Sequence, residues 1–158
     1  QYHGTTVDQP ADPELYERVI EGFPEALIED PELNAETRPL FEGHEARVTW
    51  DYPIRGVETV TDLPWEPAWL NIKPSRFGSV QSLLDTIDYC RDHGIRMFGG
   101  GQFELDVGRE HIHAIASLFY PDAPNDVAPR AYNEPEPSGD LPTSPLAPPA
   151  APRGFAWH

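Results

Sequence analysis

Short apolar runs alternate with amphipathic segments along most of this chain, and that alternation limits the folds it can adopt. The runs have the length of buried β-strands and are bounded by polar, proline or glycine residues. They predict strands at 26–28, 47–50, 69–72 and 95–98, with a further short strand at 126–128. Strands that alternate with helices form parallel sheets joined by right-handed crossovers. The order therefore predicts an α/β fold.

The segments between the strands carry the apolar spacing of helices that bury one face. Asp12 can cap a helix over 12–22, and Pro13 suits its first position. The longest predicted helix covers 79–93 and ends at Gly94. Shorter helices are predicted at 33–43, 57–63 and 108–119.

The chain is too short to close a barrel by itself. A closed (β/α)₈ barrel needs about 250 residues, and this chain has 158. Five strands therefore supply part of a TIM-type barrel, in which parallel strands alternate with helices. A small, doubly wound open sheet is the alternative that the pattern leaves open.

The composition changes near residue 134. Prolines recur from Pro135 to Pro152, and they cannot continue a helix or a central strand. We therefore predict two parts, a barrel portion over 1–133 and a Pro-rich extended tail over 134–158.

Charge and composition exclude several classes of partner. The net charge is −16 and the pI is near 4.5, which argues against binding to nucleic acid or to an anionic membrane surface. No apolar run approaches the roughly 18–20 residues of a membrane-spanning helix.

Cys90 is the single cysteine, so no internal disulfide can form. A reducing compartment, and hence a cytoplasmic location, is expected.

Three charged residues follow consecutive predicted strands at equal spacing. Glu29, Asp51 and Lys73 are 22 residues apart in each case (29 to 51, 51 to 73). Parallel barrels carry their functional groups at the carboxyl ends of the strands. Two carboxylates on neighbouring strands can share a hard divalent cation, and a lysine near that cation can act as a base. A helix-capping or surface role for each residue is the alternative.

Several sequence motifs resemble the enolase superfamily, in particular its branch of muconate lactonizing enzymes, o-succinylbenzoate synthases and N-acylamino acid racemases. Residues 70–78, which include Lys-Pro-Ser-Arg-Phe-Gly, resemble the sixth-strand motif. Residues 99–109 are similar to the seventh-strand segment, a Gly-Gly pair followed by Glu and then Gly-Arg. Residues 27–31 resemble the fourth-strand motif and 49–51 the fifth. The order and the spacing agree together over about residues 25–120.

The resemblance implies the C-terminal part of the barrel, about strands 4–8, with an essential Mg²⁺. Glu29 and Asp51 would be the second and third metal ligands. Lys73 would remove or return a proton α to a substrate carboxylate, by way of an enediolate that Mg²⁺ stabilises. Glu104 would be a catalytic residue that helps to position the substrate or the site.

Two further residues are expected to contact the substrate, and two positions depart from the family pattern. Ser75 and Gln102 lie just beyond the third and fourth predicted strands and are the expected substrate contacts. Tyr52 stands where an acidic residue is usual, and Asp30 where glutamine is common. The family's first metal ligand, its second-strand lysine and its capping domain would all precede Gln1.

The expected function is therefore that of a Mg²⁺-dependent lyase or isomerase acting on a small carboxylate substrate, with a dehydratase as the first choice. An N-terminal barrel half plus capping domain, either a separate chain or an earlier portion of the same polypeptide, would complete it. A higher oligomer is also expected. The alternatives are a racemase, epimerase or cycloisomerase of the same superfamily and, from a different class, a non-catalytic scaffold or assembly subunit.

Overall fold

Four parallel strands form one sheet, with helices between them. The computed structural model describes residues 10–102, 104, 107–126, 135–136, 139, 145–148 and 150. The strands, in the sheet order β1-β2-β3-β4, are β1 (Ile28–Glu29), β2 (Val48–Trp50), β3 (Trp69–Ile72) and β4 (Arg96–Gly99). The α-helices are α1 (Pro13–Gly22), α2 (Val57–Thr61), α3 (Val80–Asp92) and α4 (Val107–Phe119). The predicted α/β class is confirmed.

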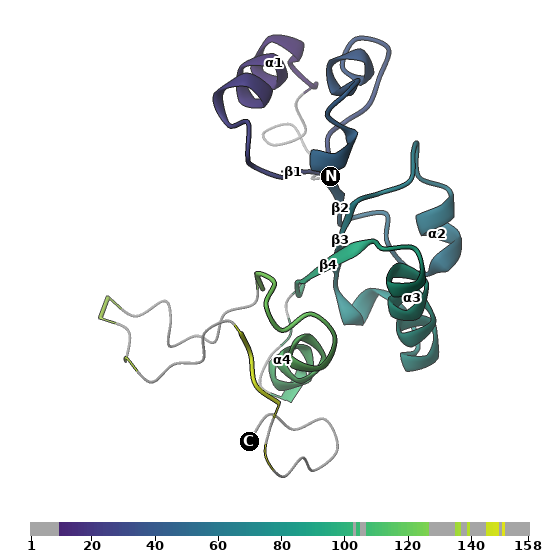
Figure 1. Ribbon diagram of the computed structural model, residues 1–158, viewed down its shortest axis with the longest axis vertical. Helices are drawn as coiled ribbons and strands as arrows, with labels where there is room; N and C mark the ends of the chain where they lie inside the picture. Colours follow the sequence, from purple (N-terminus) through teal and green to yellow (C-terminus); the bar gives the residue numbers. More distant parts are fainter. Residues whose placement is uncertain are drawn as a thin grey trace.

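The sheet order follows the chain order, as in a barrel wall. Figure 1 shows α1 beside the β1 end of the sheet, α2 and α3 along one side, and α4 near β4. Every neighbouring pair of strands is parallel. Because parallel strands in close register end at one edge, whatever follows β1, β2 and β3 is brought to the same rim.

Helix α3 shows how local sequence sets an element's limits. The Ser79 hydroxyl accepts the N–H of Ser82 at 3.1 Å and caps the first turn. The helix ends before Gly94, whose φ of +69° is a conformation that glycine adopts without steric cost. Both ends agree with the prediction to within a residue or two.

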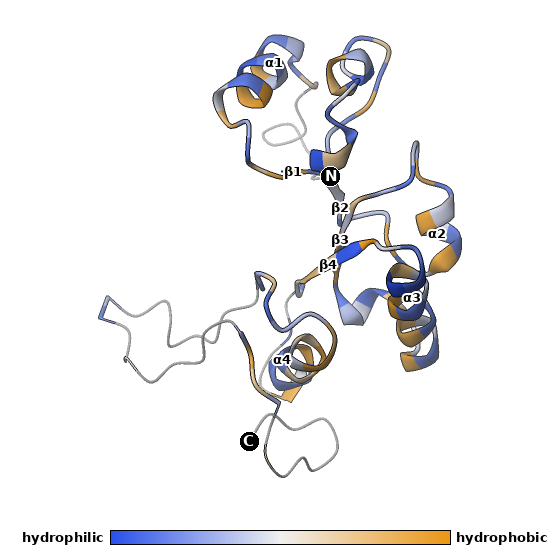
Figure 2. Ribbon diagram, viewed as in Figure 1, coloured by the Kyte–Doolittle hydropathy of each residue, from blue (hydrophilic) through white to orange (hydrophobic). Residues whose placement is uncertain are grey.

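The core lies between the sheet and the helices. In Figure 2 hydrophobic residues share α1, α3 and α4 with hydrophilic ones, as expected for helices that bury one face. Fully buried side chains come from both layers: Val48, Leu70 and Ile72 from the strands, and Ile87 and Cys90 from α3. Each large apolar side chain contributes roughly 1.5–3 kcal/mol by burial, as an upper estimate. Cys90 is a core residue, as expected.

The first strand lies later than predicted. The apolar run predicted residues 26–28, but β1 pairs with β2 through Ile28 and Glu29. Pairing continues past the strand, because the Asp30 N–H donates to the Thr49 carbonyl at 2.9 Å. The position of the partner strand, rather than the apolar run, sets the ends of β1.

The helix predicted over 33–43 is replaced by a 3₁₀ turn, η1 (Arg38–Phe41), and a second 3₁₀ turn, η2 (Glu45–Arg47), follows it. The Asn34 side chain accepts the N–H groups of Glu36 and Thr37 at 2.9 and 3.0 Å. This contact can begin a helix, but Pro39 has no N–H to donate to the carbonyl four residues earlier, so a regular helix does not continue there.

The fifth strand and the tail are only partly described. Asn125 forms a parallel bridge with Gly99, one residue before the predicted start of the strand. Residues 127–128 lie outside the described residues. In the tail, Leu146 is buried and its N–H donates to the Pro121 carbonyl at 3.0 Å. The division at 133 and 134 stays a prediction.

None of the helices in the described part of the chain is both long and apolar enough to cross a membrane.

Candidate active site

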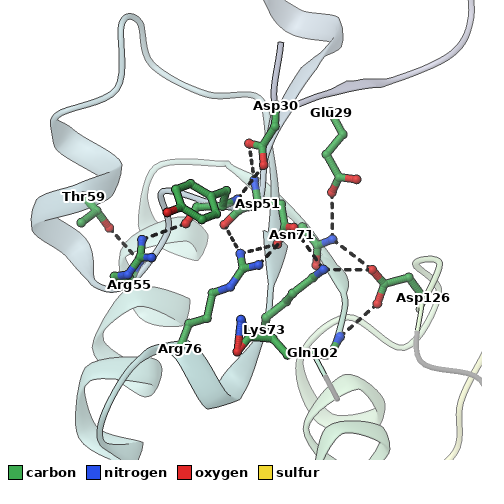
Figure 3. Close-up of polar contacts among 12 residues, drawn as sticks. Glu29, Asp30, Asp51, Arg55, Thr59, Asn71, Lys73, Arg76, Gln102 and Asp126 are labelled. Atoms are coloured by element: carbon green, nitrogen blue, oxygen red, sulfur yellow. Dashed lines mark hydrogen bonds and ion pairs between the residues drawn. The ribbon is translucent and has the colours of Figure 1, made fainter. Parts of the chain in front are cut away.

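The structure brings the three predicted charged residues to one rim of the sheet. Glu29 is the last residue of β1, Asp51 directly follows β2, and Lys73 directly follows β3. Figure 3 shows their side chains on the same side, joined through Asn71 and Asp126. We call these five residues the rim network.

Lys73 is the centre of the network and the one lysine in the sequence. Its Nζ lies 3.0 Å from Asp51 Oδ2 and 3.3 Å from Asp126 Oδ2, and the side chain is 12% exposed. Burial alone would lower the pKa of Lys73, but the hydrogen bond to Asp51 and the negative charge of Asp126 outweigh it and raise that pKa. Lys73 is therefore an ammonium group at neutral pH in this arrangement.

The side chain of Glu29, at the end of β1, accepts a hydrogen bond from a residue of β3. The Asn71 amide donates to Glu29 Oε1 at 2.9 Å. Burial raises the pKa of Glu29; the Asn71 hydrogen bond opposes this, and the negative charges of Asp51 and Asp30 add to it. Glu29 and Asp51 are thus close enough to repel each other, as two ligands of one cation would before the cation binds.

Asp51 is bound by a second cation, Arg76. The Arg76 guanidinium lies 2.6 Å from Asp51 Oδ1 and also donates to the Asp51 carbonyl. Arg76 lies in η3 (Pro74–Arg76), the turn that follows Lys73. Asp51 therefore sits between two positive side chains.

Glu104 lies beyond β4 and is held in place by hydrogen bonds. Its carboxylate accepts the backbone N–H of Gln102 and a hydrogen bond from the Ser75 side chain. Burial by itself would raise the pKa of Glu104, but these hydrogen bonds and the charge of Lys73 lower it. Glu104 Oε1 is buried without a hydrogen-bond partner. The structure thus brings Glu104 and Ser75 together, whereas Gln102 is exposed.

Three members of the site were not singled out from the sequence. Asn71 lies two residues before Lys73. Residues at this spacing share one face of a strand, and that spacing could have identified Asn71 as a member of the site. Arg76 lies three residues after Lys73, in a turn whose path the sequence does not show. Asp126 begins the predicted last strand instead of following it. The pattern of charged residues that directly follow strands therefore does not include it.

The donor chemistry of the rim suits a hard divalent cation. Carboxylate and amide oxygens are the ligands that Mg²⁺ prefers. Glu29 and Asp51 provide such oxygens, but within the described ranges no three Asp, Glu, His or Cys side chains are grouped to hold a metal ion. The described residues therefore fit a part of a magnesium site and do not complete one.

Comparisons with known proteins bear on the family and the fold of this chain. The family described as "Domain of unknown function (DUF8230) C-terminal domain" matches residues 1–134. The o-succinylbenzoate synthase of Bacillus subtilis (strain 168) is 36% identical over 59 residues, which are 37% of this chain and 16% of that protein. A crystal structure of a member of the enolase superfamily from Listeria innocua Clip11262 superimposes with a TM-score of 0.62 at 23% identity.

That superposition covers 77% of this chain and 35% of the Listeria chain, so this chain spans about a third of its solved relative. The likeness agrees with a fold that forms one part of a barrel. The resemblance to the C-terminal half of the enolase-superfamily barrel is confirmed, and the chain belongs to the family of DUF8230 C-terminal domains.

Proposed function

We propose that this chain carries the proton-transfer and metal-binding rim of a Mg²⁺-dependent lyase or isomerase of the enolase type. The observation that supports it most directly is the position of Lys73 Nζ, 3.0 Å from Asp51 and on the same rim as Glu29. An amine beside paired carboxylates at the carboxyl ends of parallel strands suits proton transfer next to a substrate carboxylate.

Glu29 and Asp51 would hold the Mg²⁺, together with ligands from outside the described residues. When bound, Mg²⁺ would stabilise the negative charge that develops on the substrate carboxylate. Asp51 would then exchange part of its contact with Lys73 for the cation.

Lys73 would remove or return the proton at the substrate α-carbon. Its raised pKa makes it an ammonium group while Asp51 is its partner. A cation held by Glu29 and Asp51 would weaken the contact between Asp51 and Lys73, and that would favour the neutral amine that a base requires. The same group, once protonated, can deliver the proton back.

Glu104 and Ser75 would position the substrate at the outer side of this amine. Their mutual hydrogen bond fixes both side chains, and Glu104 Oε1 is buried but has no hydrogen-bond partner. A buried acceptor without a partner suits a donor from a ligand. Gln102 would contribute from its exposed position in the same loop.

A dehydratase is the first choice of reaction, and a racemase, epimerase or cycloisomerase is the second. The name of the Bacillus relative, o-succinylbenzoate synthase, supports a carboxylate as substrate or product. A racemase needs a second base on the opposite face of the α-carbon, and that base would have to come from the proposed N-terminal half of the barrel.

An N-terminal barrel half and a capping domain would complete the enzyme. Strand β1 is at the end of the sheet and pairs only with β2 among the described strands, so its outer edge can accept another strand. The small share of each relative that this chain covers also supports a larger complete protein. Assembly into a higher oligomer is part of the same proposal.

The test is exchange of the α-proton in D₂O, followed by NMR, with the complete protein, Mg²⁺ and N-acylated amino acids as probes. Lys73→Ala should abolish exchange while Mg²⁺ still raises the melting temperature. Arg91→Gln is the control, because Arg91 forms an exposed ion pair with Asp88 far from the rim. Exchange that survives in Lys73→Ala would remove Lys73 as the base. If Mg²⁺ does not raise the melting temperature of the wild type, and Asp51→Asn melts at the same temperature, the non-catalytic scaffold is favoured.

A further inference from the structure

Asp126 brings a third carboxylate to the rim, from the segment that follows α4. Its Oδ2 lies 3.3 Å from Lys73 Nζ and accepts the Asn71 amide at 3.5 Å. Asn71 also donates to Glu29. Asp126 therefore contacts the amine directly and reaches the first strand through one amide (Figure 3).

The backbone around Asp126 fixes the position of this carboxylate, although its side chain is 45% exposed. The Asp126 N–H donates to the Gly99 carbonyl at 3.0 Å, and Oδ1 accepts the Gly101 N–H at 3.0 Å. Gly99 in turn donates to the Pro124 carbonyl at 2.9 Å. The segment that leads into Asp126, and the carboxylate itself, are thus attached to the end of β4 and the glycines that follow it.

Close approach at this point depends on a missing side chain. A Cβ on Gly100 would lie 2.6 Å from Lys73 Cε and 2.8 Å from Asp126 Oδ1, and it would also overlap with Asn71. Gly100 therefore lets the amine and the carboxylate meet across the end of β4.

The first partner of Lys73, the Asp51 carboxylate, is shared with other groups. Asp51 contacts Arg76 as well as Lys73, and under the proposed function it would also bind the cation. Of the residues that the structure describes, Asp126 is the other carboxylate that pairs with Lys73. It can hold the Lys73 amine in place while Asp51 is engaged elsewhere.

We propose that Asp126 is a positioning residue for Lys73, which fixes the amine and the Asn71 amide in the geometry that proton transfer requires. This inference rests on the proposed function for its kinetic consequence, and on the contacts above for its structural one. Asp126 acts through Lys73 and does not itself exchange a proton with the substrate.

The structural test uses the fact that this chain has one lysine. In the complete protein labelled with [ε-¹³C]lysine, the Lys73 signal is identified by its absence from Lys73→Arg. It should shift in Asp126→Asn and return toward its original position in Asp126→Glu. Asp122→Asn, an exposed acidic position in the same connecting segment, should leave it unchanged. A Lys73 signal that Asp126→Asn does not move would overturn the inference.

The kinetic test uses α-proton exchange of N-acetyl-L-methionine with saturating Mg²⁺. A misplaced amine should lower kcat about 10- to 100-fold with KM changed by less than about twofold, and Asp126→Glu should recover part of the loss. Equal kcat in Asp126→Asn and wild type, with Lys73→Ala inactive, would refute the positioning role and leave the proposed function standing. Exchange that persists in Lys73→Ala would refute the proposed function, and the Lys73 signal alone would then decide the role of Asp126.

Discussion

The carboxylate of Asp30 holds the backbone of Asp51: Asp30 Oδ1 accepts the Asp51 N–H at 2.9 Å, and Asp30 Oδ2 accepts the Tyr52 N–H at 2.7 Å. Asp30 adopts a φ of +47°, a left-handed conformation that is unfavourable for most residues other than glycine. The short polar side chain of aspartate makes this conformation accessible, and the turn after β1 lets Asp30 join the ends of two strands. Its effect is to fix the point from which the Asp51 side chain enters the rim.

Asp30→Ala should destabilise the complete protein by about 1–3 kcal/mol, because two N–H groups lose their acceptor. Asp30→Asn should cost less, since asparagine keeps one acceptor oxygen and tolerates the left-handed conformation. Chemical denaturation measures both. The control is Asp12→Ala, which removes a carboxylate that accepts two N–H groups at the start of α1. It should cost about 1 kcal/mol and leave proton exchange unchanged. If Asp30→Ala is as stable and as active as wild type, the bridge has no such role.

Gly100→Ala should impair the site more than the fold. The added methyl group would overlap with Asn71, Lys73 and Asp126, and Asn71 is too buried to move aside freely. We expect a loss of stability of about 1–3 kcal/mol from overpacking, together with a lower rate of α-proton exchange. Gly22→Ala is the matched control, because nothing lies within 4 Å of its added Cβ and alanine favours a helix. Equal activity of Gly100→Ala and wild type would show that the rim can expand.

The stability that Lys73 contributes should disappear at high pH. Its pKa is raised in the folded protein above its ordinary value near 10.5. The contribution is therefore fully present below about pH 10.5 and is lost as the pH rises through the folded pKa. The melting temperature of metal-free wild type should exceed that of Lys73→Met by a constant amount up to that pH, and by less above it. If the difference in melting temperature between wild type and Lys73→Met increases above that pH, the folded protein does not stabilise the ammonium form of Lys73.

Salt should stabilise this chain. The net charge of −16 implies repulsion among the acidic residues, and salt screens that repulsion. We expect the melting temperature to rise between about 0.05 and 1 M KCl, where the Debye length shortens from more than 10 Å to about 3 Å. Replacing exposed Glu17, Glu21 and Glu25 by glutamine should flatten that rise. A melting temperature that falls with KCl would mean that attractive ion pairs outweigh the repulsion.

The sequence alone determined the order and type of most elements, because the signals that set them are local. Ser79 and Gly94 define α3 through contacts within a turn of the chain, and the apolar run before Lys73 defines β3. The equal spacing of Glu29, Asp51 and Lys73 placed them at one rim, since parallel strands end together. Their roles as metal ligands and base stay predictions.

Only the tertiary structure decided which side chains touch. The hydrogen bonds of Asn71 reach 42 residues back to Glu29 and 55 residues forward to Asp126. No local pattern specifies contacts over such distances, because they depend on how the strands pair and where each one ends. The register of β1, the position of Arg76 against Asp51 and the meeting of Asp126 with Lys73 all follow from that pairing.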